Sequence, residues 1–282
     1  MELYYLKSFS CMSLKFSQDQ KARFLNERCN VSTMIRVSDI MVYLKCPRMC
    51  YFMNKGNELV KEPGVDYIQR LLLKELALTY GSALKGEDTL SGLNKELERL
   101  SYEFPVIYRL ELAGAGDAAL AEAVSCVRAW LGEISPHLSI EHYSRTCEFE
   151  PALRSDKFGL TGSPDKLIKI ADELAPSIIK TGAMPENGVW KSDRVQLTAY
   201  AILVEEIYNK VVTRGFVEYA RWGTVREVII KRHERRNVLQ LRDRVRKIHD
   251  GFMPEKPGEA PCLHCGFTEL CEVKSTLASR FF

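Results

Sequence analysis

Two cysteine motifs, one toward each end of the chain, constrain how the chain can fold. Cys46 and Cys50 lie near the start, while Cys262, Cys265 and Cys271 follow the pattern Cys-x-x-Cys-x5-Cys near the C-terminus. Three thiols so close in sequence can reach one inorganic centre, but a four-thiolate centre needs one more ligand. Cys46 is the natural fourth ligand and Cys50 is its rival. We therefore predict one centre that ties the two ends of the chain together.

The composition is that of an ordinary globular protein. The chain has 282 residues, 46% of them hydrophobic and 27% charged, which suffices to bury a substantial core. The formal net charge of +3 does not by itself demand a nucleic-acid partner. No apolar run reaches membrane-spanning length and no secretory signal pattern opens the chain, so we expect a cytoplasmic protein.

Nine cysteines in a reducing compartment favour metal or cluster ligation over disulfides. Outside the two end motifs, Cys126 and Cys147 are interpreted as buried apolar residues. Residues 1–33 show no clear periodicity, so we expect an N-terminal extension there, with Met34 as a candidate start of translation. Residues 34–282 are expected to form a single domain.

A regular pattern begins at residue 35. Ile35–Val37 predicts a short strand, and Ser38 is the expected cap of the helix that follows. Pro47 disfavours helical geometry at Cys46, so we expect a helix to be interrupted there. Three helices are then predicted at 66–80, 88–103 and 116–134, forming a helical insertion over about 64–135.

From about residue 145 the pattern changes to short strands with interspersed helices. Strands are predicted at 146–150, 160–170, 175–180, 215–220 and 225–231, and helices at 192–209 and 233–250. Strands flanked by helices in this way predict an α/β (α+β) fold with a central mixed sheet.

Polar residues cluster at three places in the second half of the chain. Asp165 closes a Gly-Ser-Pro-Asp step at an expected strand end, Lys180 closes the neighbouring strand, and Gln196 and Tyr200 share one helix face. A carboxylate that holds Mg²⁺ or Mn²⁺ beside an ammonium group suits phosphodiester hydrolysis. Taken singly, each residue could equally be a turn residue, a solvated strand end or an ordinary helix edge.

The order of these motifs resembles that of the RecB-like PD-(D/E)xK nucleases. In particular, it resembles the CRISPR-associated exonuclease family that carries an iron–sulfur cluster (the Cas-four family). The resemblance runs from about Ile35 to Cys271 and implies a restriction-endonuclease-like core. It implies catalytic roles for Asp165, Lys180, Gln196 and Tyr200, and a 4Fe–4S cluster bound by Cys46, Cys262, Cys265 and Cys271. It also implies single-stranded DNA as substrate, Mn²⁺ or Mg²⁺ as cofactor, and integrase proteins of CRISPR adaptation as partners.

Two departures from the family pattern concern the metal. Ile178 stands where the family has Glu or Asp, and the expected helix at Tyr67–Tyr80 has no histidine, only Gln69 and Glu75. Asp165 and the backbone carbonyl of Ile179 remain as metal ligands. A substitute carboxylate could come from one of three acidic residues, Glu148, Glu150 and Glu173.

Three functions remain open on the sequence. The first is a metal-dependent DNA exonuclease. The second is a catalytically degenerate iron–sulfur protein that binds DNA or acts as an adaptor. The third is a zinc-stapled protein of unrelated role, although structural zinc usually pairs two Cys-x-x-Cys knuckles or adds two histidines.

Overall fold

The computed structural model describes residues 34–57, 63–258, 260 and 262–273. The chain divides into two units, Met1–Thr33 and Met34–Phe282, and the residues described here belong to the second. The expected N-terminal extension at 1–33 lies outside the described residues.

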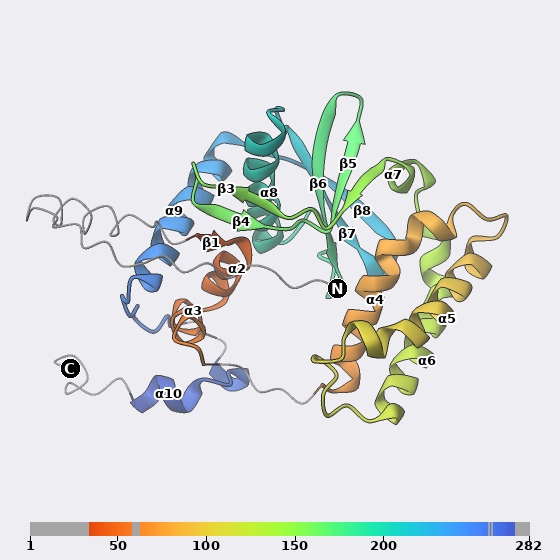
Figure 1. The fold of residues 1–282 in the computed structure, drawn as a ribbon, viewed down its shortest axis with the longest axis horizontal. Helices are drawn as coiled ribbons and strands as arrows, with labels where there is room; N and C mark the ends of the chain where they lie inside the picture. Colours follow the sequence, from red (N-terminus) through yellow and green to blue (C-terminus); the bar gives the residue numbers. More distant parts are fainter. Residues whose placement is uncertain (1–33, 58–62, 259, 261, 274–282) are drawn as a thin grey trace, which may run out of the picture. The chain divides into compact units, whose positions relative to one another are not determined.

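A five-stranded mixed sheet forms the centre of the domain (Figure 1). Its strands β6 and β7 are parallel and the other neighbouring pairs are antiparallel. The parallel pair requires a crossover, which the helix between them supplies. The predicted α/β fold with a central mixed sheet is therefore confirmed. In spatial order the strands are β2 (Thr146–Phe149), β5 (Lys166–Ile170), β6 (Glu173–Lys180), β7 (Arg214–Tyr219) and β8 (Thr224–Ile229).

A second, smaller sheet contains β1 (Ile35–Arg36), β4 (Leu160–Gly162) and β3 (Leu153–Ser155). The prediction of one strand over 160–170 was wrong, because β4 and β5 belong to different sheets. Pro164 lies in the gap between them and has no N–H for a ladder hydrogen bond. Consequently Asp165 stands immediately before β5, at the start of a strand and not at its end as predicted.

Helices cover both faces of the central sheet (Figure 1). On one face lie α2 (Val37–Lys45), α3 (Pro47–Asn54), α8 (Lys191–Tyr208) and α9 (Arg232–His249), and on the other α4 (Val65–Ala83), α5 (Thr89–Ile107) and α6 (Asp117–Ile134). Successive side chains of β6 point to opposite faces of the sheet. Ile178 is buried in the cluster that includes α8 and α9, and Ile179 in the cluster that includes α4, α5 and α6. This alternation decides which β6 side chains can face a ligand.

The N-terminal helices meet at Cys46. The predicted Ser38 cap is wrong: α2 begins at Val37, Arg36 is the N-cap, and the Asp39 carboxylate accepts the Arg36 N–H at 3.1 Å. Cys46 adopts an extended conformation (φ −163°, ψ 120°) between α2 and α3, which confirms the expected helix interruption. Pro47 is the first residue of α3, where its missing N–H costs no hydrogen bond.

Two further expectations concern burial. Cys126 on α6 is half-buried and Cys147 on β2 is exposed, so the interpretation of both as buried residues is wrong. Cys147 lies on an edge strand of the sheet, where its Sγ donates to the Leu167 carbonyl oxygen at 3.3 Å. Across the described ranges, no helix combines the length and apolarity that crossing a membrane demands.

Candidate functional site

The Asp165 carboxylate is held by two elements that are far apart in sequence. Its Oδ2 accepts the backbone N–H of Ile179 at 2.7 Å, which fixes it against β6. Its Oδ1 forms an ion pair with Nζ of Lys74 on α4 at 2.9 Å. Both oxygens of the predicted metal ligand are thus engaged by the protein itself.

Gly162, the first residue of the Gly-Ser-Pro-Asp step, lies where two side chains approach the backbone. A Cβ at this position would be 2.9 Å from Cε1 of Tyr200 and 2.9 Å from Cγ2 of Val37. Real Cβ atoms do not tolerate such contacts, so only glycine allows Tyr200 to pack here. The glycine brings the α8 residue next to the segment that carries Asp165.

Lys180 lies at the end of β6 and is oriented from α8. Its Nζ donates to Oε1 of Gln196 at 2.7 Å and forms an ion pair with Oδ1 of Asp193 at 2.9 Å. Asp193 is buried and also accepts the Tyr219 hydroxyl at 3.3 Å. Asp193 was not among the predicted site residues, although its spacing three residues before Gln196 puts both on one helix face.

Tyr200 completes the group. It hydrogen-bonds Gln196, and its burial raises its pKa above the ordinary value. Asp165 accepts the N–H of Ile179, the residue before Lys180, and Lys180 donates to Gln196, so these groups lie in one neighbourhood. The structure therefore brings Asp165, Lys180, Gln196 and Tyr200 together, while their catalytic roles remain predictions.

Lys74 is a residue that the sequence analysis did not select. It lies on α4, in the stretch where the family resemblance implies a histidine, and its Nζ reaches Asp165 at 2.9 Å and Oε1 of Glu150 at 3.4 Å. Burial opposes its charge, but the carboxylates of Asp165 and Glu150 outweigh this effect and raise the pKa of Lys74. An ammonium group therefore sits between two carboxylates beside the candidate site.

The metal ligands expected by resemblance are incomplete. Ile178 is fully buried in the apolar cluster around α8 and offers no ligand atom. Of the three acidic alternatives, Glu148 accepts the Tyr208 hydroxyl at 2.7 Å and Glu173 pairs with Arg214 at 3.2 Å. Glu150 is the alternative that adjoins Asp165, since the two share Lys74. The Lys74 ammonium contacts both of these carboxylates.

In the part of the chain that the structure describes, no cluster of three or more His, Cys, Asp or Glu side chains is arranged to hold a metal ion. Neither the carboxylates near Lys74 nor the described cysteines of the two end motifs form such a cluster. A divalent ion beside Asp165 would have two carboxylates and a backbone carbonyl at most, with water as its other ligands.

The four predicted cluster cysteines line one small cavity. Cys46 from the α2–α3 junction meets Cys262, Cys265 and Cys271, with Met49, Phe52 and Phe267 among the apolar lining residues. The cavity volume is about 20 Å³, room for about one water molecule.

Arg48 donates hydrogen bonds to one of these cysteines, Cys271. Its Nη1 donates to Sγ of Cys271 at 3.2 Å and to the Cys271 carbonyl oxygen at 3.2 Å. Hydrogen bonds to cysteine sulfurs are among the features that tune thiolate-bound metal centres. This Arg48 contact directly links the Cys-Pro-Arg motif to the C-terminal motif.

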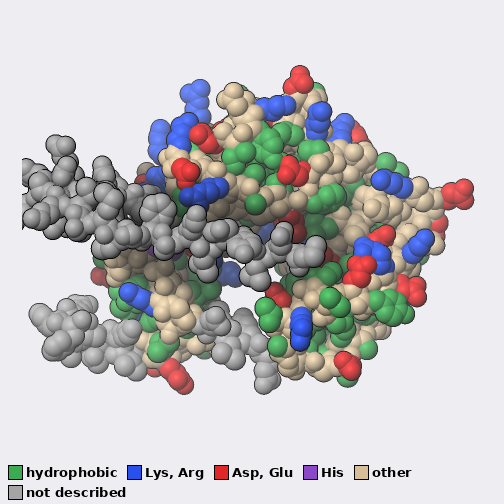
Figure 2. Space-filling view, viewed as in Figure 1, with side chains coloured by type: hydrophobic (Ala, Val, Ile, Leu, Met, Phe, Trp, Pro, Cys, Tyr) green, Lys and Arg blue, Asp and Glu red, His purple; other side chains and the backbone are tan. Residues whose placement is uncertain are grey.

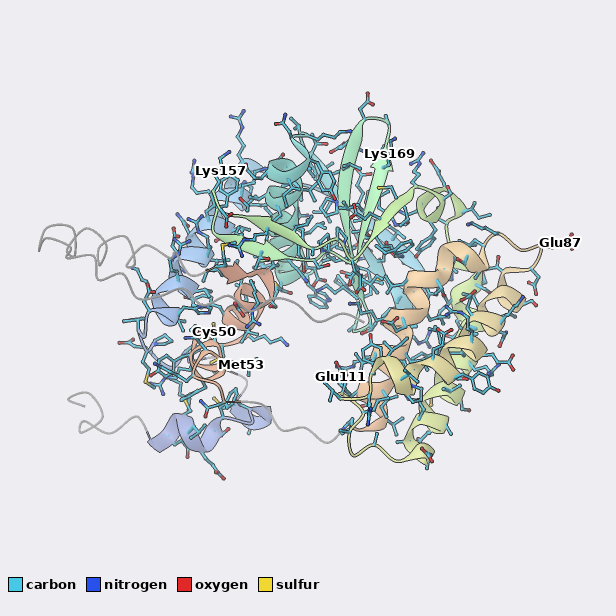
Figure 3. The ribbon with its side chains drawn as sticks, in the orientation of Figure 1. Cys50, Met53, Glu87, Glu111, Lys157 and Lys169 are labelled. Carbon is cyan, nitrogen blue, oxygen red and sulfur yellow. The ribbon has the colours of Figure 1, made fainter. Side chains whose placement is uncertain are left out.

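Cys50, the rival fourth ligand, does not line the cavity. Its side chain, labelled on α3 in Figure 3, is buried with Sγ 3.8 Å from the Asp39 carbonyl oxygen. Burial raises the pKa of Cys50 to about 12, which disfavours the thiolate that a metal requires. Of Cys46 and Cys50, Cys46 is the one placed with the C-terminal three.

A buried polar network on the other face of the sheet was not predicted. Glu218 of β7 accepts hydrogen bonds from Lys166 Nζ at 2.7 Å and Ser177 Oγ at 2.6 Å, and His142 Nε2 lies 3.1 Å from its Oε1. Lys166 also donates to the Ala77 carbonyl oxygen of α4 at 2.9 Å. Because Lys166 follows Asp165 directly, this network fixes the strand that presents the candidate site.

The chain belongs to the PD-(D/E)XK nuclease superfamily, whose family model matches residues 37–272. An uncharacterized protein of Archaeoglobus fulgidus is 26% identical over 249 residues, covering 88% of this chain and all of the relative. A CRISPR-associated exonuclease Cas4/endonuclease Cas1 fusion of Leptospira interrogans is 26% identical over 128 residues. That match covers 43% of this chain and 24% of the fusion protein.

Among solved structures, the crystal structure of SSO0001 is similar with a TM-score of 0.37 and 15% identity, covering 91% of this chain and 95% of the other. The family match stands without it. Nucleases of the superfamily generally use Mg²⁺ or Mn²⁺ and act on nucleic-acid phosphodiester bonds, so the assignment indicates a phosphodiesterase fold.

Proposed function

We propose that this protein is a DNA nuclease that hydrolyses phosphodiester bonds in single-stranded DNA or at single-stranded ends, as an exonuclease. The observation that carries the proposal is the joint placement of Asp165, Lys180 and the Gln196–Tyr200 pair in a chain of the nuclease superfamily. The exonuclease and single-strand preferences rest on the resemblance of the motifs.

Lys180 is the group best prepared to act on a phosphate. Gln196 and Asp193 hold its ammonium in place, and a fixed cation stabilises the negative charge that develops on a phosphate during hydrolysis. Asp165, the Ile179 carbonyl and Glu150 are the groups that would hold Mn²⁺ or Mg²⁺. A bound metal would supply charge neutralisation and an activated water.

We expect Asp165→Asn to lower the rate of single-stranded DNA cleavage by at least about 100-fold, because it removes a charge at the reacting centre. The assay follows end-labelled single-stranded DNA with graded Mn²⁺. Asp156→Asn is the matched control, since Asp156 is exposed and pairs only locally with Arg154. Equal cleavage by the wild type and Asp165→Asn would place the active site elsewhere.

A second candidate function is a DNA-binding protein of this fold that no longer hydrolyses DNA. Two observations favour it: Ile178 is buried where the family has a carboxylate, and the Lys74 ammonium occupies the carboxylate pair. DNA would then bind mainly through its phosphates, with an affinity that falls steeply with salt. Salt-dependent binding without cleavage at any Mn²⁺ concentration would favour this candidate.

The basic residues that could contact phosphates occur in short local groups. On the face drawn in Figure 2, Lys and Arg side chains are interspersed with Asp and Glu. At the start of α8, Lys191 is exposed, whereas Arg194 is engaged by Glu234 at 3.0 Å and the Ile229 carbonyl oxygen at 3.2 Å. Lys191 is therefore the better of the two for a phosphate contact.

We further propose that Cys46, Cys262, Cys265 and Cys271 bind a 4Fe–4S cluster. Their shared cavity and the Arg48 hydrogen bond to Cys271 support this assignment. We expect Cys262→Ser to lose most of its bound iron and to unfold at a lower temperature, because a link between distant parts of the chain is lost.

The test is iron analysis and an absorption spectrum of anaerobically purified protein. Cys50→Ser is the matched control and is expected to retain iron, because Cys50 lies outside the cavity. A colourless wild-type protein that contains zinc would favour the zinc-stapled alternative.

We also propose integrase proteins of CRISPR adaptation as partners of this protein. The support for this association is the Leptospira relative, whose name joins a CRISPR-associated exonuclease and an endonuclease in one chain. Mixing this protein with an integrase of that class and measuring co-migration on a sizing column tests the association. Separate elution at micromolar concentration would remove this part of the proposal.

A further inference from the structure

We propose that Lys74 is a built-in counter-cation of the candidate nuclease site, which competes with divalent metal ions for Asp165 and Glu150. The inference rests on the proposed function to the extent that it concerns the same site. It assigns a role to a residue that belongs to none of the motifs of the resemblance.

The position of Lys74 is fixed by its helix. Leu72, Leu73 and Leu76 around it are all buried, so the register of α4 against the sheet cannot change without exposing them. This packing directs the Lys74 side chain toward the segment between β4 and β5. The ammonium then lies 2.9 Å from Oδ1 of Asp165 and 3.4 Å from Oε1 of Glu150.

The two carboxylates are themselves held by the backbone. The N–H of Glu150 donates to the Asp165 carbonyl oxygen at 3.0 Å, so the two residues are neighbours whatever their side chains do. Asp165 is further fixed by the Ile179 N–H. Without Lys74, two carboxylates would face each other with no cation between them in the contacts described, an arrangement that attracts a metal ion.

Lys74 and a divalent ion cannot share this place at low cost. With both cations present, like charges would lie a few ångströms apart in a partly buried site, where their repulsion is only partly screened. The Lys74 side chain is 34% exposed, so it can withdraw to solvent when a metal enters. Metal binding must then break its contacts with Asp165 and Glu150, which lowers the affinity.

The experiment is a titration of the full-length protein with Mn²⁺ in the absence of DNA, with free Mn²⁺ followed by electron paramagnetic resonance. We expect Lys74→Met to lower the Kd for Mn²⁺ at least about tenfold relative to the wild type, because a unit positive charge leaves the site. Lys74→Arg keeps the charge and is expected to bind Mn²⁺ as weakly as the wild type. Lys74→Gln serves the same purpose as Lys74→Met should the latter fold poorly.

The roles of Asp165 and Glu150 as metal ligands are tested in the Lys74→Met variant. Adding Asp165→Asn or Glu150→Gln to Lys74→Met is expected to remove the gain in affinity. Arg70→Met is the matched control, because Arg70 is exposed on the same helix one turn earlier and its loss changes the net charge equally. An equal gain from Arg70→Met, or no gain from Lys74→Met, overturns the inference.

A second measurement does not depend on catalysis. Mn²⁺ is expected to raise the Tm of Lys74→Met more than that of the wild type, since at one concentration the ligand that binds the folded state more tightly stabilises it more. Tight Mn²⁺ binding by Lys74→Met together with no DNA cleavage by the wild type would contradict the nuclease proposal and leave this inference standing. Robust DNA cleavage by the wild type, with an Mn²⁺ affinity of Lys74→Met equal to that of the wild type, would support the nuclease proposal and overturn this inference.

Discussion

Replacing Glu218 by alanine is expected to lower the free energy of unfolding by about 3–5 kcal/mol, because it leaves the buried ammonium of Lys166 without its carboxylate. Glu218 and Lys166 are both almost completely buried, and their 2.7 Å contact lies between the sheet and α4. The measurement is chemical denaturation at neutral pH. Glu227→Ala is the control, since Glu227 forms an exposed pair with Arg214 whose loss costs at most about 1 kcal/mol.

The same network predicts a dependence of stability on acid. Burial raises the pKa of Glu218, but the positive charge of Lys166 and the contact with His142 outweigh it and lower the pKa to about 2. A carboxylate with a lowered pKa stabilises the fold above its unfolded pKa, near 4.5, and loses this contribution as the pH falls toward 2. We therefore expect the difference in stability between the wild type and Glu218→Gln to shrink over that range. A constant difference down to pH 2 would contradict the assignment.

Much of the fold could be predicted from the sequence because its helices carry strong periodic patterns. The helices predicted at 88–103 and 116–134 occur at 89–107 and 117–134. The strand predicted at 160–170 failed because the hydrophobic pattern continues across Pro164 while the hydrogen bonding does not. Local patterns describe elements well but do not reveal which sheet a strand joins.

The candidate site was predictable where its residues lie in recognisable motifs. Asp165, Lys180, Gln196 and Tyr200 were selected from the sequence and lie together, and Cys46 joins the C-terminal cysteines. Lys74 was missed because its partner Asp165 is distant in sequence. Asp193 was missed because the helix pattern around it gives no sign of its contact with Lys180. A lysine on an amphipathic helix is normally solvated, so only the packing of α4 against the sheet discloses the contact with Asp165.

The substitution Ile178→Glu restores the carboxylate expected by resemblance, and its outcome depends on what surrounds position 178. The Ile178 side chain is fully buried in an apolar cluster that includes Leu197 and Val217. A carboxylate placed there would be desolvated without a described partner, so its pKa would rise and it would be neutral at moderately acidic pH. The variant is therefore expected to fold less stably and not to gain activity.

We expect Ile178→Glu to lower the free energy of unfolding at pH 7 by at least about 3 kcal/mol. Because the folded-state pKa of the new glutamate is raised, the loss grows as the pH increases above the unfolded pKa and is smaller in acid. Ile178→Gln separates polarity from charge, and Ile178→Leu, which preserves volume, is expected to cost less than about 1.5 kcal/mol. The measurements are denaturation curves at several pH values and cleavage of single-stranded DNA at graded Mn²⁺. Unchanged stability with faster cleavage at lower Mn²⁺ would mean that position 178 opens toward Asp165 and that a metal ligand had been restored.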